Sequence, residues 1–306
     1  GSSRFGPGRR FGIFPSASAA WNIKNEPFLQ DNATWLSTLK FRVSWGINGN
    51  DRIPAFQYAA QTATGNNYVF GSGALGNEAI VNGVKTTVTP NDDLGWEQSH
   101  QTDFGLDFGF FGNSLQLTAD YFYKRTEGML QVMPVPTYLG ESKPWGNVGE
   151  MSNSGIELDM NYRYSIGDFN FSIGANATYI KTILINAGNE TGILDGGSFH
   201  QMGTITRGQN GMVYPYFYGY KTDGVFQNWD EVNSYVGADG SLIQPSAQPG
   251  DFRYQDLDGD GKITPNDRTI LGFNKEAFRM SLSTNLSYKG WNLYVLFNGV
   301  FSGGRY

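Results

Sequence analysis

Residues 156–164 read IELDMNYRY, and residues 169–179 read FNFSIGANATY. Apolar and polar residues alternate through both stretches without a break. Successive side chains of a β-strand point to opposite faces, so each stretch predicts a strand with one apolar and one polar face. A short segment that contains Ile166-Gly167-Asp168 separates the two. The pair therefore predicts an antiparallel hairpin with a tight turn.

The same alternation recurs in six further stretches, which brings the expected number of strong strands to eight. Strands of about ten residues are long enough to cross a bilayer when they are tilted. A soluble β-sandwich would show the same alternation with its polar faces in water, so the pattern alone leaves both architectures open. The six stretches are residues 16–24, 39–48, 103–110, 115–124, 279–288 and 291–297.

The lengths of the connections favour the membrane barrel. Short and long connections alternate along the chain. The short ones lie at about 112–114, 166–168 and 289–290, and a moderate one over 25–38 is expected to contain a helical turn at Trp35-Leu36. The long ones lie at about 51–100, 127–151 and 183–272. Membrane barrels have short periplasmic turns and long extracellular loops, whereas a sandwich has no reason to sort its loops in this way. We therefore predict an all-β fold, an antiparallel transmembrane β-barrel with three long extracellular loops.

Composition excludes several other classes of protein. Charged residues make up 16% of the chain, aromatic residues 15%, and glycine occurs 41 times. No apolar run approaches the roughly 18 residues of a transmembrane helix, so a helical membrane protein is excluded. The net charge of −6 and the lack of a basic stripe argue against nucleic acid as a partner.

The barrel is expected to be incomplete within residues 1–306. Eight strands close only a narrow barrel, and loops of this size are far larger than such a pore needs. The last strand has no closing partner in view, and an open strand edge in lipid would leave backbone groups without hydrogen bonds. The N-terminal residues GSSRFG contain no apolar segment of a signal peptide, and we interpret them as native sequence inside a longer protein.

Residues 256–267 read DLDGDGKITPND, which matches the pattern of a calcium-binding loop. Asp256, Asp258 and Asp260 occupy positions 1, 3 and 5, the backbone carbonyl of Lys262 falls at position 7, and Asp267 falls at position 12. The spacing predicts a Ca²⁺ ion that orders an extracellular loop. The alternative is a simple Asp/Gly-rich turn, since Asp is shorter than the usual Glu at position 12 and Pro265 prevents the helix that follows an EF-hand loop.

No pattern in the sequence predicts an enzyme. His100 and His200 have no carboxylate or serine motif beside them, and GSGALG at 71–76 lacks the strand–helix context of a dinucleotide site. Glu157 and Asp159 share the polar face of one strand, where charges that line the barrel lumen are expected more than an acid–base pair.

Aromatic residues in the long loops are the candidates for substrate contact. Trp145, Trp229 and the run YPYFY at 214–218 could stack on sugar rings or hold peptide side chains. For any single one of these residues, packing of the loops against one another is the stronger expectation. The sequence therefore leaves the substrate-contacting residues unknown.

The motifs, in their order along the chain, resemble a carboxy-terminal stretch of the barrel of a SusC-like (SusC/RagA-type) TonB-dependent transporter. The resemblance extends over nearly the whole chain and rests on GSSRFG (1–6), FGIFPS (11–16), Trp21, EPF (26–28), LKFRVSWG (39–46), NGN (48–50), LGWE (94–97), GLD (105–107), DYFYK (120–124), NVG (147–149), NSGIEL (153–158), TDGVFQ (222–227), PGD (249–251), the acidic loop, DRTILG (267–272) and Gly290-Trp291.

The resemblance implies a barrel of about 22 strands whose plug domain is absent from this chain. It further implies the outer membrane of a Gram-negative bacterium, and import of oligosaccharides or peptides with a SusD-like surface lipoprotein. Such pairs of transporter and lipoprotein would form dimers, and energy would come from TonB through a segment absent here.

Two other functions stay open at this point. One is a passive porin or surface-anchoring barrel, which would conduct without a plug. The other is a soluble Ca²⁺-dependent carbohydrate-binding β domain, which would be monomeric without detergent.

Overall fold

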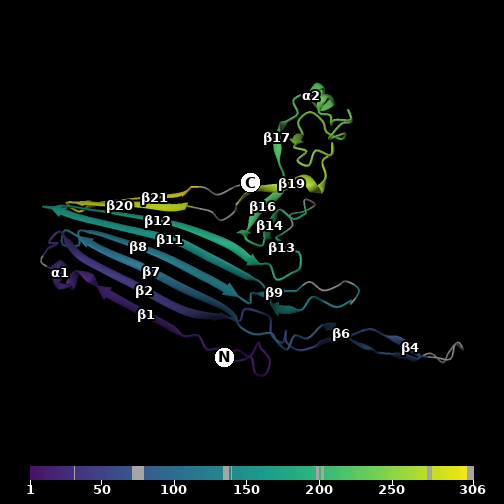
Figure 1. Cartoon of the computed structure of the whole chain (residues 1–306), viewed down its shortest axis with the longest axis horizontal. Coiled ribbons are helices and arrows are strands. Elements are labelled where there is room, and N and C mark those ends of the chain that lie inside the picture. Colours follow the sequence, from purple (N-terminus) through teal and green to yellow (C-terminus); the bar gives the residue numbers. More distant parts are fainter. Residues whose placement is uncertain are drawn as a thin grey trace.

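The computed structural model describes residues 1–30, 32–70, 79–133, 138, 140–197, 200, 203–273 and 278–301, and its main feature is one long antiparallel sheet (Figure 1). Eight strands lie side by side in this sheet, in the order in which they occur along the chain, and each is hydrogen-bonded to the next. The predicted eight-strand wall is therefore confirmed. The strands are β1 (Ser16–Asn22), β2 (Leu36–Asn50), β7 (Glu97–Phe110), β8 (Leu115–Glu127), β11 (Glu150–Ile166), β12 (Phe169–Asn186), β20 (Phe278–Tyr288) and β21 (Trp291–Phe301).

The register of the sheet keeps like residues in rows. Leu158 lies opposite Ala119 of β8 and Ala177 of β12, whereas the next residue, Asp159, lies opposite Thr118 and Asn176. Because side chains alternate between faces, apolar rows collect on one face of the sheet and polar rows on the other. The sheet is a two-faced wall.

Aromatic residues border the apolar face at two heights. One row near the loop end follows the register across β7, β8, β11, β12, β20 and β21, and it is aromatic except at Ile156 of β11. Its members are Phe104, Tyr121, Ile156, Tyr179, Phe278 and Phe301. Near the turn end, Tyr162, Tyr164, Phe169 and Phe171 make edge and tilted ring contacts, and Tyr288 and Trp291 flank the last turn. Two such rows are typical of the interfacial girdles of a membrane barrel.

The strands are longer than the ten or so residues predicted from the alternation. β11 has 17 residues and β12 has 18. Beyond the loop-end aromatic row, Arg125 pairs with Glu127 and Glu150 on the side of the sheet that is apolar lower down. The strands therefore continue past the apolar band. The alternation of apolar and polar residues is confined to that band, so the strand length predicted from the alternation was too short.

The turns at the other end of the sheet are short. Lys289 and Gly290 both have positive φ, 43° and 87°, which is the conformation of a two-residue type I′ hairpin. At the predicted helical turn, Trp35-Leu36, the structure has a single turn in which the Leu36 amide donates to the Ala33 carbonyl at 3.1 Å, and it has no helix. A 3₁₀ turn η1 (Ile23–Asn25) and a short helix α1 (Pro27–Gln30) come earlier, and β2 already begins at Leu36 because the Trp35 carbonyl accepts from the Phe111 amide and extends the sheet.

The three long connections leave from one end of the sheet and carry small structures of their own (Figure 1). The first holds β3 (Gln61–Thr64) paired with β6 (Val84–Val88) and β4 (Tyr68–Phe70) paired with β5 (Ala79–Val81). The second holds β9 (Leu130–Val132) and β10 (Trp145–Asn147). The third holds a sheet of β13 (Ile193–Asp195), β14 (Thr206–Gln209), β16 (Tyr216–Tyr220) and β19 (Arg268–Phe273), and the strand β15 (Met212–Val213), which pairs with β12. It also holds the pair β17 (Thr222–Val225) and β18 (Phe252–Tyr254), the helix α2 (Trp229–Ser234) and the 3₁₀ turn η4 (Pro265–Asp267).

The clusters of buried hydrophobic side chains among the described residues lie at the loop end of the molecule. Phe5, Ile53 and Leu94 form one cluster, and Phe226, Val232 and Ala247 form another. Within the described part of the chain, no helix has both the length and the apolarity needed to span a membrane.

Candidate functional site: the polar face and the loops above it

Arg42 is the centre of an ion cluster on the polar face. Its Nε and Nη2 atoms donate to the two carboxylate oxygens of Asp107 at 2.8 and 2.9 Å, and Nη2 also donates to Asp120 at 2.9 Å. The Thr118 hydroxyl donates at 3.3 Å to Asp107 Oδ1, the oxygen that also accepts from Arg42 Nη2. The cluster joins β2, β7 and β8 across the face, and the fork of the guanidinium fixes its geometry.

Gly105 makes room for this cluster. It lies between Arg42 and Asp120 in the register of the sheet. A Cβ atom at this position would fall 2.6 Å from the Arg42 Cζ atom and would also collide with the Asp120 carboxylate. A glycine is required here by the close approach of two charged side chains.

Glu157 and Asp159 lie on the same polar face, next to the ion cluster. With Asp120, Asn176 and Thr178 they line a shallow hollow of about 200 Å³. Neither carboxylate has an ion pair or a hydrogen-bonded partner among the described residues, and both side chains are exposed. Their place on the polar face agrees with the expected role as charges of the barrel lumen, and they do not form a close pair with a base or a nucleophile.

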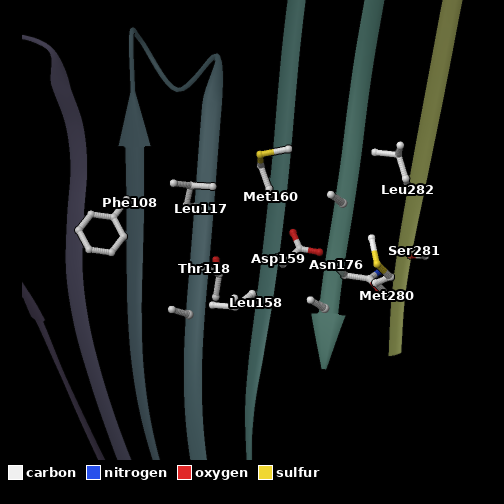
Figure 2. Close-up of a pocket in the computed structure, with 13 residues that line it drawn as sticks. Phe108, Leu117, Thr118, Leu158, Asp159, Met160, Asn176, Met280, Ser281 and Leu282 are labelled. Carbon is white, nitrogen blue, oxygen red and sulfur yellow. The ribbon is translucent and has the colours of Figure 1, made fainter. Parts of the chain in front are cut away.

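The opposite, apolar face carries a second and larger hollow in the middle of the wall (Figure 2). Its volume is about 450 Å³. Ala119, Ala175 and Ala177 are its small residues, and larger apolar side chains of β7, β8, β11 and β20 surround them. This hollow belongs to the face between the two aromatic rows.

The structure brings Asp256, Asp258 and Asp260 of the acidic loop together. One carboxylate oxygen from each lies within 4.8 Å of the other two. Among the described residues this is the one group of three or more His, Cys, Asp or Glu side chains with the spacing of a metal site. The loop is shaped by its own carboxylates, since Asp256 accepts from the Gly259 and Gly261 amides at 2.7 and 2.8 Å.

Asp267 is not a member of this group of three carboxylates, and it holds the ends of the loop together. Its side chain is fully buried and accepts from the amides of Leu257 and Thr264, each at 2.7 Å, and of Asp258 at 3.4 Å. The hydrogen bonds from Thr264 and Leu257 lower the pKa of this carboxyl against the opposing effect of burial. Lys262 donates its amide to Asp260 at 2.9 Å. As ligands, Asp267 and the Lys262 carbonyl stay predictions.

The aromatic candidates for substrate contact have different surroundings. Trp145 packs against the Phe5 cluster, and Tyr216 is 2% exposed, so both stabilise the loops. The Tyr218 ring lies beneath the guanidinium groups of Arg207 at 3.9 Å and Arg268 at 4.9 Å. Trp229 remains 57% exposed on α2 and is the most accessible of the set.

The remaining sequence candidates are the histidines and the glycine pattern at 71–76. His100 lies in β7 opposite Ile47 and Arg125. Residues 71–76, with the glycine pattern, fall outside the described residues. The alternation did not identify the Arg42 cluster, although its members sit at polar positions of three strands. Pairing those strands in register would have revealed it.

Comparison with known proteins places the chain in a family. The family model "TonB dependent receptor-like, beta-barrel" matches residues 2–202. TonB-dependent receptor P3 of Formosa agariphila is 33% identical over 308 residues, which cover 99% of this chain and 29% of that protein. TonB-dependent receptor SusC of Bacteroides thetaiotaomicron is 28% identical over 305 residues, which cover 95% of this chain and 28% of that protein.

Solved structures have the same fold. The RagAB peptide transporter superposes with a TM-score of 0.73 at 24% identity, over 97% of this chain and 30% of that chain. The RagAB peptide importer in its "open-open" state gives a TM-score of 0.74 at 23% identity, over 98% of this chain and 30% of that chain. The chain thus spans less than a third of the length of these relatives.

The sequence match over well over half of the chain, the two-faced antiparallel wall and the sorted loops agree with one another. The chain therefore belongs to the TonB dependent receptor-like β-barrel family.

Proposed function

We propose that this chain forms part of the wall and the extracellular loops of an outer-membrane transporter that imports oligosaccharides or peptides. In this proposal a SusD-like surface lipoprotein covers the loops, a plug domain closes the lumen, and TonB supplies the energy through a segment outside this chain. Pairs of transporter and lipoprotein associate as dimers in the outer membrane of a Gram-negative bacterium.

Family membership is the observation that carries the proposal. The name of a similar solved structure, the RagAB peptide transporter, supports peptides as a substrate class, and the relative SusC supports the SusC-like type of transporter. The polar face supports it chemically, because Arg42, Glu157 and Asp159 would give a water-filled lumen its charged lining. The exposed Trp229 supports contact of the loops with a ligand or with the lipoprotein.

Removal of the TonB-coupling segment from the full-length transporter tests active import. Uptake of a labelled oligosaccharide or peptide by whole cells is expected to stop, because the plug could no longer be moved. A matched deletion of equal length in an exposed loop of the same protein controls for loss of protein from the membrane. Unchanged uptake after the coupling segment is removed would contradict the proposal and favour the passive barrel.

We also propose that Ca²⁺ binds Asp256, Asp258 and Asp260, with Lys262 and Asp267 as the further predicted ligands. The convergence of three carboxylates supports this, since such a group is stabilised by a hard cation. Protease cleavage of the loop in the full-length protein is expected to be slower in Ca²⁺ than in EGTA.

The double variant Asp256→Asn with Asp258→Asn is expected to remove this protection by Ca²⁺. Asp230→Asn on α2 changes one exposed carboxylate outside the loop and is expected to keep it. Equal cleavage with and without Ca²⁺ in the unmodified protein would show that the loop is an acidic turn without a metal.

A further inference from the structure

The hollow on the apolar face is built by a change of side-chain size along the wall. Two neighbouring rows cross its centre, one running Ala119–Leu158–Ala177–Met280 and the other Leu117–Met160–Ala175–Leu282. The three alanines leave space that leucine or phenylalanine would fill, and the result is an open depression of about 450 Å³ across β7, β8, β11, β12 and β20 (Figure 2).

The chemistry of the lining restricts what can occupy the hollow. The side chains on this face are Phe, Leu, Met and Ala. Thr118, Asp159, Asn176 and Ser281 also border it, but they occupy the alternate positions whose side chains belong to the polar face. No charged side chain of the apolar rows faces the hollow, so its occupant must be uncharged and apolar.

The position of the hollow between the two aromatic rows shows what surrounds it. The aromatic row that contains Tyr121 and Tyr179 lies on its loop side, and Tyr162 and Phe171 lie on its turn side. Aromatic rows of a membrane barrel sit at the two interfaces with water, so the band between them contacts hydrocarbon. The hollow is continuous with this lipid-facing surface and opens into it.

We propose that the hollow holds one acyl chain of a membrane lipid, which stays bound longer than the lipid around the rest of the wall. Met160 and Met280 border the space with flexible thioether side chains, which adapt to a flexible hydrocarbon chain. The proposal depends on the apolar face being the lipid face. It does not depend on the substrate or on TonB.

The test uses the full-length transporter extracted from its membrane and washed with excess detergent. Mass spectrometry of the intact protein measures the lipid that stays bound. Ala177→Phe fills the hollow with an apolar side chain and is expected to abolish retention of that lipid. Ala19→Phe makes the same change on the apolar face of β1, away from the hollow, and is expected to leave retention unchanged. Equal retention in Ala177→Phe and the unmodified protein would overturn the proposal.

A second measurement needs no variant and covers the case in which Ala177→Phe does not fold. A phospholipid with a photoreactive diazirine on its acyl chain is incorporated into vesicles with the unmodified transporter. Cross-links are expected to concentrate in β11, β12 and β20 relative to β1. Uniform labelling of the apolar face would overturn the proposal, and so would labelling that appears only when dimers dissociate, because the hollow would then be an interface between two copies.

Discussion

Asp267 is a buried carboxylate that stays charged because the backbone around it is arranged as donors. Three amides point at its two oxygens, and Thr264 completes a capping box with it at the start of η4. A carboxylate that accepts several backbone hydrogen bonds is stabilised in its charged form, which is why its pKa is lowered. This residue ties the end of the acidic loop to its beginning.

The acidic loop is expected to loosen in acid as Asp267 takes up a proton. A lowered pKa in the folded loop means that the stabilisation is complete above the ordinary Asp pKa of about 3.9 and is lost as pH falls through the lower folded value. Hydrogen exchange of residues 252–273, measured from pH 7 downwards, should show faster opening only in the acid range.

Asp267→Ala should open the loop on the order of tenfold more often already at neutral pH, because three donors lose their acceptor. Asp230→Ala, at an exposed carboxylate of α2 without a hydrogen-bonded partner among the described residues, is the matched control. A loop that exchanges at the same rate in Asp267→Ala and in the control would assign the closure of the loop to other contacts.

At the scale of single elements, β7 shows how one strand supplies side chains to both the apolar and the polar face of the sheet. Phe104, Leu106 and Phe108 supply its apolar face, while Asp103 and Asp107 supply its polar face. Ser44 and Gln101 donate to Asp103 at 3.0 and 2.9 Å, and Arg42 donates to Asp107. The glycine between these two carboxylates leaves the space in which Arg42 reaches Asp120.

Gly105→Ala is expected to destabilise the wall, because the new methyl group displaces Arg42 from between its two carboxylates. The expected loss is about 1–3 kcal/mol, the usual cost of overpacking. Gly174→Ala on β12 is a matched control, since its Cβ atom would come close to the Ser283 hydroxyl alone, at 2.7 Å, and would lie 4.0 Å from the Met160 carbonyl oxygen. The Ser283 hydroxyl can move away at the cost of its 3.3 Å hydrogen bond to the Gly174 carbonyl. Urea unfolding of the two variants in vesicles compares them, and equal midpoints would show that the ion cluster adapts without cost.

At the scale of the whole molecule, the wall separates two solvents. Its apolar rows lie between aromatic borders, its polar rows carry Arg42, Asp107, Asp120, Glu157 and Asp159, and its long loops extend from one end (Figure 1). The Arg125 cluster with Glu127 and Glu150 lies beyond the aromatic border at the loop end. The apolar band, the polar face and the loop end of the sheet are thus each marked by residue type.

Leu158→Arg should impair insertion, because it places a cation in the middle of the apolar band at a cost of about 2–4 kcal/mol. Asn176→Arg lies at nearly the same height on the polar face and should insert normally. The fraction of full-length protein that folds into vesicles, read from heat-modifiable migration in gels, compares the two. Better insertion of Leu158→Arg than of Asn176→Arg would show that the polar face, and not the apolar face, contacts the lipid.

The wall was predictable from sequence because alternation with a period of two is set by the two solvents and not by distant contacts. The Arg42 cluster required the register between strands, which the sequence of one strand does not contain. The short strands of the loops, such as β14 and β16, depend on packing around Tyr216 and Tyr218 and carry no clear period. In the acidic loop, the carboxylate spacing predicted the convergence of three Asp residues but not the separate hydrogen bonds of Asp267.

The hydrophobic cluster of Phe226, Val232 and Ala247 has a consequence for how such proteins change over time. This cluster lies within the third connection and shares no residue with the wall. A lineage can therefore exchange, lengthen or shorten that surface structure without rebuilding the ladder of strands below it. Sequence change is expected to concentrate in this surface structure, because substitutions in the strands must keep one apolar and one polar face.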